Sequence, residues 1–391
     1  MQQLVLKSGR DRSLLNRHPW VFSGAVKQLP QAENGEMVQV LSNNGQLLGY
    51  GFFSPNSQIT CRVFEFTAKP VVIDGAFWAH KIKQAHKLRQ LFINQTLTNT
   101  YRLIHAEGDF LPGVIIDVYH DVAVVQLLIR GTERIKEYIF NALFEIGIKH
   151  IYIKTKSSTQ RLEEVASPSE WVNSMRPSVY PIDTIENSIR FMIDVEKGQK
   201  TGFFIDQREN RKLVGQYAAG KKVLNTFSYS GGFSLYALAA GATLVHSVDS
   251  SREAIEMCDK NVEANGWQNR HEGFCEDVFD YMQKTELDYD IMVLDPPAFA
   301  KNARAVPNAT RGYKNLNLIA FKKIKPGGLI FTFSCSQHID RDLFRKVVFG
   351  AAADAGRNVR IIRQLTQPED HPINIFHPEG EYLKGLMLHV E

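Results

Sequence analysis

The fold is decided by VLNTFSYSGG, residues 223–232 of a 391-residue chain. An apolar run, expected to be a β-strand, passes through small polar residues and two glycines into the apolar helix-forming stretch FSLYALAA. Such a turn lets a ligand carboxylate or ribose approach backbone N–H groups that bulky side chains would block. The predicted binding turn comprises Phe227, Ser228, Tyr229, Ser230, Gly231 and Gly232.

Outward from this turn, strand-like and helix-like segments alternate from about Glu196 onward. Strands are expected at KKVLNTF, ATLVHSVD, GFCED, YDIMVLD and GLIFTFS, and helix-forming segments such as SSREAIEMCDKNVEANG lie between them. This alternation is typical of an α/β domain with a mostly parallel sheet. The last pair, NVRIIRQL and KGLMLHV, predicts an antiparallel closing hairpin.

Two acidic residues follow the next two strands in order. Asp249 stands eighteen residues after Gly231, where an acid commonly holds ligand ribose hydroxyls, and Asp277 ends the third strand, where an adenine amino group would bind. Either acid alone is equally explained as a helix N-cap, Asp249 before Ser250 especially. The absence of G-x-G-x-x-G argues against NAD. Together with the turn, the acids predict an adenosyl ligand, and Ser250 and Val278 are expected to line the same site.

A rigid acidic turn, Asp295-Pro296-Pro297-Ala298-Phe299, follows the fourth strand. The prolines fix the backbone dihedrals, so Asp295 and its carbonyl are held in place. Such a turn suits a planar substrate such as a base, with Pro296 beside it and Phe299 stacking on it. The alternative is a plain proline-rich turn.

Cys335 lies in FTFSCSQHI, directly after the fifth strand, and should face the same crevice as Asp295. The C5 carbon of a pyrimidine is a weak nucleophile, and thiolate attack at C6 activates it. Methylation of an exocyclic amine needs only a D-P-P-[YF]-like grip, whereas this chain has D-P-P-A-F. We therefore expect Cys335 to act as the nucleophile in methylation at C5 of a pyrimidine. The alternative is a packed bystander.

The remaining composition favours a soluble cytoplasmic protein with no membrane span and no metal. Cys61, Cys258 and Cys275 form no C-x-x-C pair with each other or with Cys335, and we expect all three to pack. Net charge is only +4, but two basic stretches favour phosphate contacts over a merely solvated face. The residues expected at RNA phosphates are Arg10, Arg12, Lys301, Arg304, Arg311 and Lys314.

Three domains are expected along the chain. Residues 1–70 are β-rich, with short strands between turn signals. Residues 72–190 form a mixed α+β unit with helices near 77–93 and 133–146, ending in an irregular Pro/Ser-rich stretch. Residues 191–391 form the α/β domain.

The segment 225–232, Asp249, Asp277 and LDPPAF (294–299) resemble motifs I to IV of class I S-adenosylmethionine methyltransferases. The resemblance implies a Rossmann-like, seven-stranded sheet and S-adenosyl-L-methionine as cofactor. The S-C-S around Cys335 resembles the nucleophile motif of RNA 5-methylcytosine methyltransferases. Many of those carry a second cysteine near D-P-P, which is missing here, so the group that removes the C5 proton stays unassigned. This departure points to the single-cysteine branch typified by the ribosomal RNA large subunit methyltransferase I family.

Other segments resemble the same branch. KGQKTGFFIDQREN (197–210) looks like the segment entering its catalytic domain, which implies that Gln207 and Arg208 meet the methionine end of the cofactor. A salt-bridged arginine at a helix start is the alternative for Arg208. RLIHAEGDFLPGVIIDVY (102–119) looks like its middle domain, with structural residues or an RNA-cleft wall. The tail 369–386 looks like its closing segment. GRDRSLLNRHPWVFSGAV (9–26) looks like its PUA domain, an RNA-binding β-barrel.

The main hypothesis is a methyltransferase that forms 5-methylcytosine in large-subunit ribosomal RNA through a Cys335–C6 adduct. Asp295 would hold the target base near N3. One alternative is an RNA methyltransferase acting on a guanine or an exocyclic amine, with Cys335 idle. Another is a non-catalytic RNA-binding ribosome-assembly factor with a vestigial cofactor site. The sequence leaves open whether the chain is a monomer or a homodimer.

Overall fold

The computed structural model describes residues 1–286 and 288–391, without the side chain of Ser158. Contacts divide the chain into two units. The N-terminal unit comprises Met1–Ile185, Ile193–Phe203 and Glu369–Glu381, and the C-terminal unit comprises Glu186–Met192, Phe204–Pro368 and Tyr382–Glu391. Among the described residues, none of the helices combines the length and hydropathy that a bilayer span requires.

The first domain is a six-stranded sheet in the order β2-β6-β5-β4-β1-β3. Apolar residues at alternate positions of β1, β4 and β6 pack into one small core, because alternate side chains of a strand share a face. Gly51 of β5 is required there, since a Cβ would lie 2.4 Å from Cys61 Sγ. The elements are β1 (Gln3–Leu6), α1 (Arg12–Leu15), β2 (Trp20–Phe22), β3 (Val26–Gln28), β4 (Met37–Leu41), β5 (Leu47–Phe53) and β6 (Ile59–Phe66).

The middle region is an α+β layer built on a five-stranded sheet in the order β11-β10-β9-β8-β7. The predicted helices are present, but the second is divided at Ile135 into α3 and α4. The Pro/Ser-rich stretch predicted to be irregular contains the two-residue strand β11. The elements are α2 (Gly75–Phe92), β7 (Thr100–His105), β8 (Val114–Tyr119), β9 (Val122–Leu127), α3 (Arg130–Arg134), α4 (Lys136–Glu145), β10 (His150–Ile153), α5 (Ser157–Glu163), β11 (Glu170–Trp171), and the hairpin β12 (Ile182–Glu186) and β13 (Ile189–Ile193).

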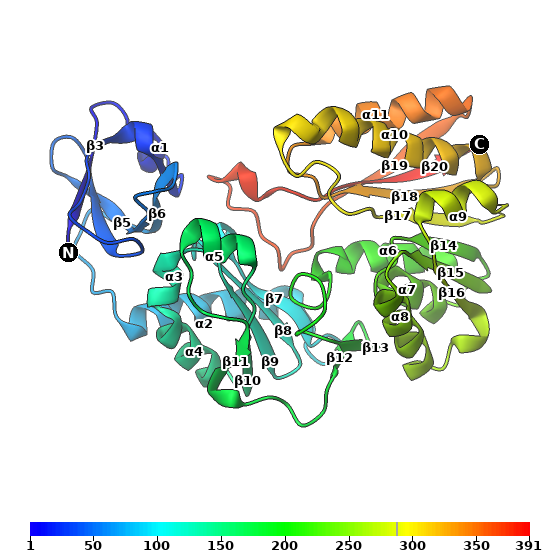
Figure 1. Cartoon of the computed structure of the whole chain (residues 1–391), viewed down its shortest axis with the longest axis horizontal. Helices are drawn as coiled ribbons and strands as arrows, with labels where there is room; N and C mark the ends of the chain where they lie inside the picture. Colours follow the sequence, from blue (N-terminus) through cyan, green and yellow to red (C-terminus); the bar gives the residue numbers. More distant parts are fainter. Residues whose placement is uncertain (287) are drawn as a thin grey trace. The chain divides into compact units, whose positions relative to one another are not determined.

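The C-terminal unit is a seven-stranded sheet in the order β16-β15-β14-β17-β18-β20-β19. The first five strands in sequence run parallel, and β20 is antiparallel to both β18 and β19, as predicted. Helices α9, α10 and α11 share one core against the sheet, and α6, α7 and α8 cover the other face (Figure 1). The strands are β14 (Lys222–Thr226), β15 (Leu244–Asp249), β16 (His271–Cys275), β17 (Ile291–Leu294), β18 (Gly328–Ser334), β19 (Val359–Leu365) and β20 (Lys384–Val390); the helices are α6 (Arg208–Ala218), α7 (Gly232–Ala239), α8 (Arg252–Ala264), α9 (Val278–Lys284), α10 (Val306–Lys323) and α11 (Arg341–Ala355).

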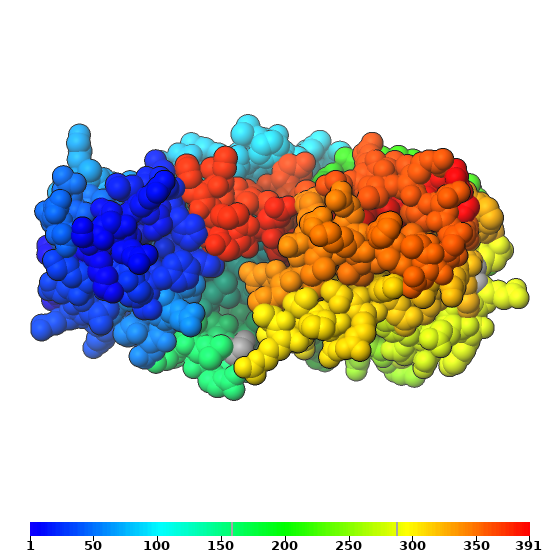
Figure 2. Space-filling view, turned by 90° about the horizontal axis from the view of Figure 1, so that it is seen from above, coloured from blue at the N-terminus to red at the C-terminus, as the bar shows by residue number. Residues whose placement is uncertain are grey.

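Part of the tail lies outside the unit in which it was expected, the domain 191–391. Residues 369–381 have their contacts in the N-terminal unit, and only 382–391 return as β20. The cause is a buried ionic network: Asp370 accepts from the Arg102 N–H at 3.0 Å, and its carbonyl accepts from Arg89 at 3.0 Å. Trp20 and His377 are also in edge-on contact at 4.4 Å, and Figure 2 shows the tail segment, in red, beside the blue N-terminal strands.

The segment 102–119 is structural at its charged positions. Arg89 and Asp109 form a bidentate ion pair at 2.6 Å, and Arg102 pairs with Asp117 at 2.7 and 2.9 Å. All four side chains are almost fully buried, and removing one partner would leave a buried charge uncompensated. These pairs fix β7 and β8 and receive the tail.

Candidate functional site

The Gly-rich turn between β14 and α7 has left-handed backbone at alternate residues. The φ angles are 53° at Phe227, 47° at Tyr229 and 85° at Gly231. Such φ values are strained for residues other than glycine and concentrate at functional sites. Runs of backbone N–H groups in such turns form concavities that attract anions. The turn is held by Ser228, whose N–H donates to the Val248 carbonyl at 3.0 Å.

Gly231 has a packing role in addition to the predicted one. A Cβ there would lie 2.4 Å from the Sγ of Cys258 in α8, so the missing side chain permits helix packing and the left-handed φ. Cys258 is fully buried as expected, and burial raises its pKa to about 12. Helix packing and the left-handed φ therefore require this glycine, and ligand approach at the same position stays a prediction.

Two serines of the turn have buried hydroxyls that make no hydrogen bond among the described residues. The Oγ atoms of Ser228 and Ser230 are buried and have no hydrogen-bond partner among the described residues. A buried polar atom without a partner is costly, so it indicates an interaction with something absent. The hydroxyls, the strained backbone and the N–H groups together fit a polar ligand in this turn.

Asp249 is aimed at the turn. Its Oδ2 accepts from the Tyr229 N–H at 3.0 Å, and its Oδ1 accepts from the Ser251 N–H at 2.9 Å. The N-cap of α8 is Ser251, so the cap alternative for Asp249 is wrong. The neighbouring Ser250 is exposed. The carboxylate therefore lies at the end of β15 next to the turn, where it can receive a hydroxyl.

Asp277 does cap a helix. Its Oδ1 accepts from the N–H groups of Phe279 at 2.8 Å and Asp280 at 3.1 Å, so it begins α9. The residue is exposed, and the side chain of Val278 is buried in the core of the unit. As the first residue of α9, Val278 has a backbone N–H without an acceptor within the helix. A capping role and contact with an adenine through the second carboxylate oxygen are compatible.

Gln207 and Arg208 are both buried at the start of α6. The Gln207 Oε1 accepts from Asn210 at 2.6 Å, and Arg208 Nε lies 3.1 Å from Glu209, as the salt-bridge alternative for Arg208 predicted. Immediately before them, the ring of Phe204 meets the ring of Tyr229 edge-on at 5.2 Å. The segment thus lies against the Gly-rich turn.

Strand order brings the predicted groups to one edge. The chain reverses direction across the sheet between β14 and β17, and open α/β sheets bind ligands at that point, outside the carboxyl ends of the strands. The turn follows β14, Asp249 ends β15, Asp277 follows β16, and Asp295 follows β17. Cys335 follows β18, whose Thr332 pairs with Leu294 of β17.

The residue after the D-P-P turn, Ala300, ties that turn to Ser334–Ser336, the turn that contains Cys335. The Ala300 N–H donates to Ser336 Oγ at 3.2 Å, and Asp295 is half-buried above the strand end. Phe299 is packed on α10: its ring lies 4.7 Å from Tyr313 and covers Gly312. Pro296 is buried. Stacking of Phe299 on a base remains a prediction, and packing is the role that its contacts demonstrate.

Cys335 differs from the two core cysteines. Cys61 and Cys258 are fully buried and burial raises the pKa of each to about 12, whereas Cys335 is partly exposed. Cys275 was expected to pack, but it is also partly exposed, because β16 is the edge strand; its thiol lies 3.7 Å from the Ser250 carbonyl. Thiolate chemistry requires access, which Cys335 has.

Two residues of this site were missed by sequence reasoning. Tyr313 donates or accepts at 2.9 Å with Ser336 Oγ, and Lys384 Nζ donates to the Ser336 carbonyl at 2.7 Å. Tyr313 sits in an ordinary helical pattern and gave no signal. Lys384 is a charge at the start of the apolar strand KGLMLHV, which could have marked it.

Most of the predicted RNA-binding cations are exposed at the surface. Lys301, Arg304 and Arg311 are exposed around the start of α10, whereas Lys314 pairs with Asp354 at 2.7 Å. Arg10 and Arg12 are exposed in the first domain. Among the described residues, no group of three or more His, Cys, Asp or Glu side chains could hold a metal ion.

Two family models match this chain, and curated relatives align with it over almost its whole length. Residues 154–377 match the S-adenosylmethionine-dependent methyltransferase family model, and residues 4–66 match that of a PUA-like domain. The chain is 41% identical over 397 residues to ribosomal RNA large subunit methyltransferase I of Shewanella denitrificans, covering 99% of each. The enzyme of that name from Aeromonas salmonicida is 39% identical, covering 98% of each.

The chain belongs to the ribosomal RNA large subunit methyltransferase I family. It is an S-adenosylmethionine-dependent methyltransferase with an N-terminal PUA-like domain. A crystal structure of SMU.776, a methyltransferase complexed with SAH, is similar in fold, with a TM-score of 0.84, 24% identity and full coverage of both chains. The predicted fold class and cofactor are thereby confirmed.

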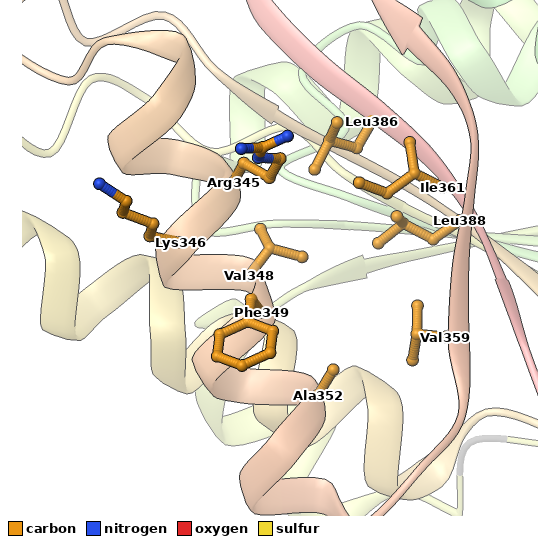
Figure 3. Close-up of a pocket in the computed structure, with 9 residues that line it drawn as sticks. All are labelled: Arg345, Lys346, Val348, Phe349, Ala352, Val359, Ile361, Leu386 and Leu388. Atoms are coloured by element: carbon orange, nitrogen blue, oxygen red, sulfur yellow. The ribbon is translucent and has the colours of Figure 1, made fainter.

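A groove elsewhere in the C-terminal unit is not part of this site. It encloses about 360 Å³ between α11 and strands β19 and β20 (Figure 3). Apolar side chains such as Phe349, Ile361 and Leu388 face it, and Arg345 and Lys346 lie at its rim. None of its lining residues is a predicted site residue.

Proposed function

We propose that this methyltransferase forms 5-methylcytosine in large-subunit ribosomal RNA through a covalent cysteine adduct. The relatives described above are named as methyltransferases of large-subunit ribosomal RNA, and almost the whole chain aligns with them. The observation that carries the finer proposal is the partly exposed Cys335 at the end of β18, beside the strand end that bears Asp295.

The cofactor half would be built from the turn and the acids. When bound, S-adenosyl-L-methionine supplies an electrophilic methyl group. Asp249 would hold ribose hydroxyls, Asp277 and the Val278 N–H would meet the adenine, and Ser228 and Ser230 would donate their free hydroxyls. Arg208 would pair with the methionine carboxylate, for which its guanidinium has suitable geometry.

The acceptor half would be built from Cys335 and Asp295. The Cys335 thiolate would bond to C6 of cytosine, and the C5–C6 π electrons would shift to C5 and toward N3, to which Asp295, as the carboxylic acid, would donate a hydrogen bond. C5 would then take the methyl group that the bound cofactor supplies, as the sulfur–methyl bond of the cofactor breaks and S-adenosylhomocysteine is left. Loss of the C5 proton to a base or to water restores the double bond as the S–C6 bond breaks and the thiolate returns.

The RNA would be held largely through its phosphates. Lys301 and Arg304 are exposed between the D-P-P turn and α10, Arg311 is exposed in α10, and Arg10 and Arg12 are exposed in the PUA-like domain. Phosphate contacts position an RNA without specifying its sequence. The target cytosine should be unpaired or flipped, because both C5 and C6 must be reached.

The direct test compares Cys335→Ala with Cys275→Ala, a matched change at the other partly exposed cysteine. Each protein is incubated with tritiated cofactor and ribosomal RNA that lacks the modification. Cys335→Ala should lose at least about a thousandfold in rate, since the nucleophilic route is closed, and Cys275→Ala should stay within a few-fold of wild type. Wild-type transfer by Cys335→Ala would contradict the adduct.

Mass spectrometry of the digested product separates the competing chemistries. Label in 5-methylcytidine supports the proposal. Label in a methylated guanosine or an N-methylated base would replace it with a chemistry in which Cys335 is idle. Failure to bind the cofactor in a calorimetric titration would favour a non-catalytic assembly factor.

A further inference from the structure

Lys384 is a buried ammonium next to the cysteine turn, and neither the family match nor the sequence gives it a role. It is 4% exposed and opens β20 opposite Ser334, the residue before Cys335. Its Nζ donates to the carbonyl oxygens of Ser336 and Tyr382, both at 2.7 Å. A buried charge is stable only when its hydrogen bonds are made, so this lysine is committed to the turn.

The turn around Cys335 is held from three directions. Lys384 binds the carbonyl of Ser336, while Ser336 Oγ meets the Tyr313 hydroxyl at 2.9 Å and the Ala300 N–H at 3.2 Å. Both Ser334 and Ser336 are fully buried, whereas Cys335 between them is partly exposed. The backbone on each side of the thiol is therefore fixed while the thiol stays accessible.

The ionisable side chains around the Cys335 turn, within the C-terminal unit, differ in charge. Lys384 from β20 brings a positive charge, and Tyr313 from α10 stays neutral, because burial raises its pKa and negative charge on Cys335 raises it further. Asp295, after β17, is the opposing acid at the neighbouring strand end. A lysine beside a thiol favours its thiolate form, which is the nucleophile.

We propose that Lys384 is the positioning residue of Cys335: it locks the Ser334–Ser336 turn and stabilises the thiolate that attacks the base. The inference rests on the proposed role of Cys335. Lys384 acts through the turn, so it affects the reactivity of the thiol before any RNA binds. Cofactor binding, which uses the ends of β14, β15 and β16, does not depend on it.

The test measures alkylation of the thiols by iodoacetamide against pH, with each cysteine-containing peptide quantified by mass spectrometry. In wild type, Cys335 should react with a midpoint at least about one pH unit below that of Cys275, the internal reference. Lys384→Met should raise the Cys335 midpoint by about one unit or more and leave Cys275 unchanged. Lys384→Arg, which keeps the charge, should restore most of the shift.

The outcomes separate the two proposals. An unchanged Cys335 profile in folded Lys384→Met overturns the role of Lys384, even if Cys335→Ala abolishes methylation. If Lys384→Met does not fold, the wild-type profile decides: equal midpoints for Cys335 and Cys275 overturn the inference. If the shifts occur but Cys335→Ala methylates normally, the Lys384 effect stands and the adduct mechanism fails. In the methylation assay, kcat should fall in Lys384→Met with KM for the cofactor unchanged.

Discussion

Individual residues at the Gly-rich turn combine strain and unmet hydrogen-bonding capacity. Phe227 and Tyr229 hold left-handed φ angles without being glycine, and the hydroxyls of Ser228 and Ser230 are buried without partners among the described residues. Both features lower stability unless something compensates for them. In the proposed assignment the cofactor supplies that compensation, so ligand binding and folding should be strongly linked here.

Gly231→Ala should lower the free energy of unfolding by about 2–4 kcal/mol, since the Cβ adds a clash with Cys258 to a strained φ of 85°. Gly241→Ala is the control: its φ is 90°, but a Cβ there would meet nothing within 4 Å. Urea unfolding of both variants isolates the clash. Equal losses in the two would show that packing against Cys258 contributes nothing.

Asp249→Asn should weaken binding of S-adenosylhomocysteine by tenfold or more, because the carboxylate is the strong acceptor for ribose hydroxyls. Stability should change little, since an amide oxygen can still accept from the Tyr229 or Ser251 N–H. Calorimetric titration measures the affinity, with the exposed Asp259→Asn on α8 as a control. An unchanged affinity would remove Asp249 from the cofactor site.

At the scale of elements, the sequence predicted most where short-range pattern controls structure. All seven strands of the C-terminal sheet were located: the central ones are apolar runs that become buried, and the two edge strands β16 and β19 are recognisable from the turn residues that bound them although they stay largely exposed. The Gly-rich turn and the residues at the strand ends follow from this. Three features were not predicted from the sequence pattern, because they depend on tertiary contacts. They are the break at Ile135 between α3 and α4, the short strand β11, and the packing of Phe299 on Tyr313.

One contact between elements was invisible in the sequence. Lys323, at the end of α10, donates from Nζ to the carbonyls of Met282, Gln283 and Thr285 at 2.7, 2.7 and 3.0 Å. These carbonyls lie at the end of α9 and would otherwise lack hydrogen-bond donors within the helix. A cation there also opposes the negative end of the helix dipole.

Lys323→Met should therefore lower the free energy of unfolding by about 1–2 kcal/mol. Lys322→Met changes the exposed neighbour and should have an effect within about 0.5 kcal/mol. Thermal and urea unfolding compare them directly. If both variants match wild type, the three hydrogen bonds make no net contribution.

At the scale of the whole molecule, the chain does not divide where composition changes. The tail 369–381 belongs by its contacts to the N-terminal unit, and residues 193–203, expected to open the catalytic domain, belong there too. The reason is long-range pairing: Asp370 with Arg102, and Thr201 with Asp117 at 2.5 Å. Sequence separation of this size leaves no local pattern to detect.

Acid should destabilise the protein through histidines that are buried in neutral form. Burial, together with the nearby charge of His246, lowers the pKa of His271 to about 4. In the unfolded chain this histidine binds a proton near pH 6.5, whereas in the folded chain it stays neutral until about pH 4. The free energy of unfolding therefore falls as the pH drops from about 6.5 to about 4. His271→Gln should remove up to about 1 kcal/mol per pH unit of that slope, while exposed His338→Gln should not.

Sequencing of large-subunit ribosomal RNA for 5-methylcytosine tests the central claim most directly. RNA is compared from cells that lack this gene and from the same cells carrying either the wild-type chain or Cys335→Ala. A cytosine that loses its methyl group in the deletion, regains it with the wild-type chain and stays unmodified with Cys335→Ala is the predicted result. Full 5-methylcytosine in the deletion strain, or restoration by Cys335→Ala, would contradict it.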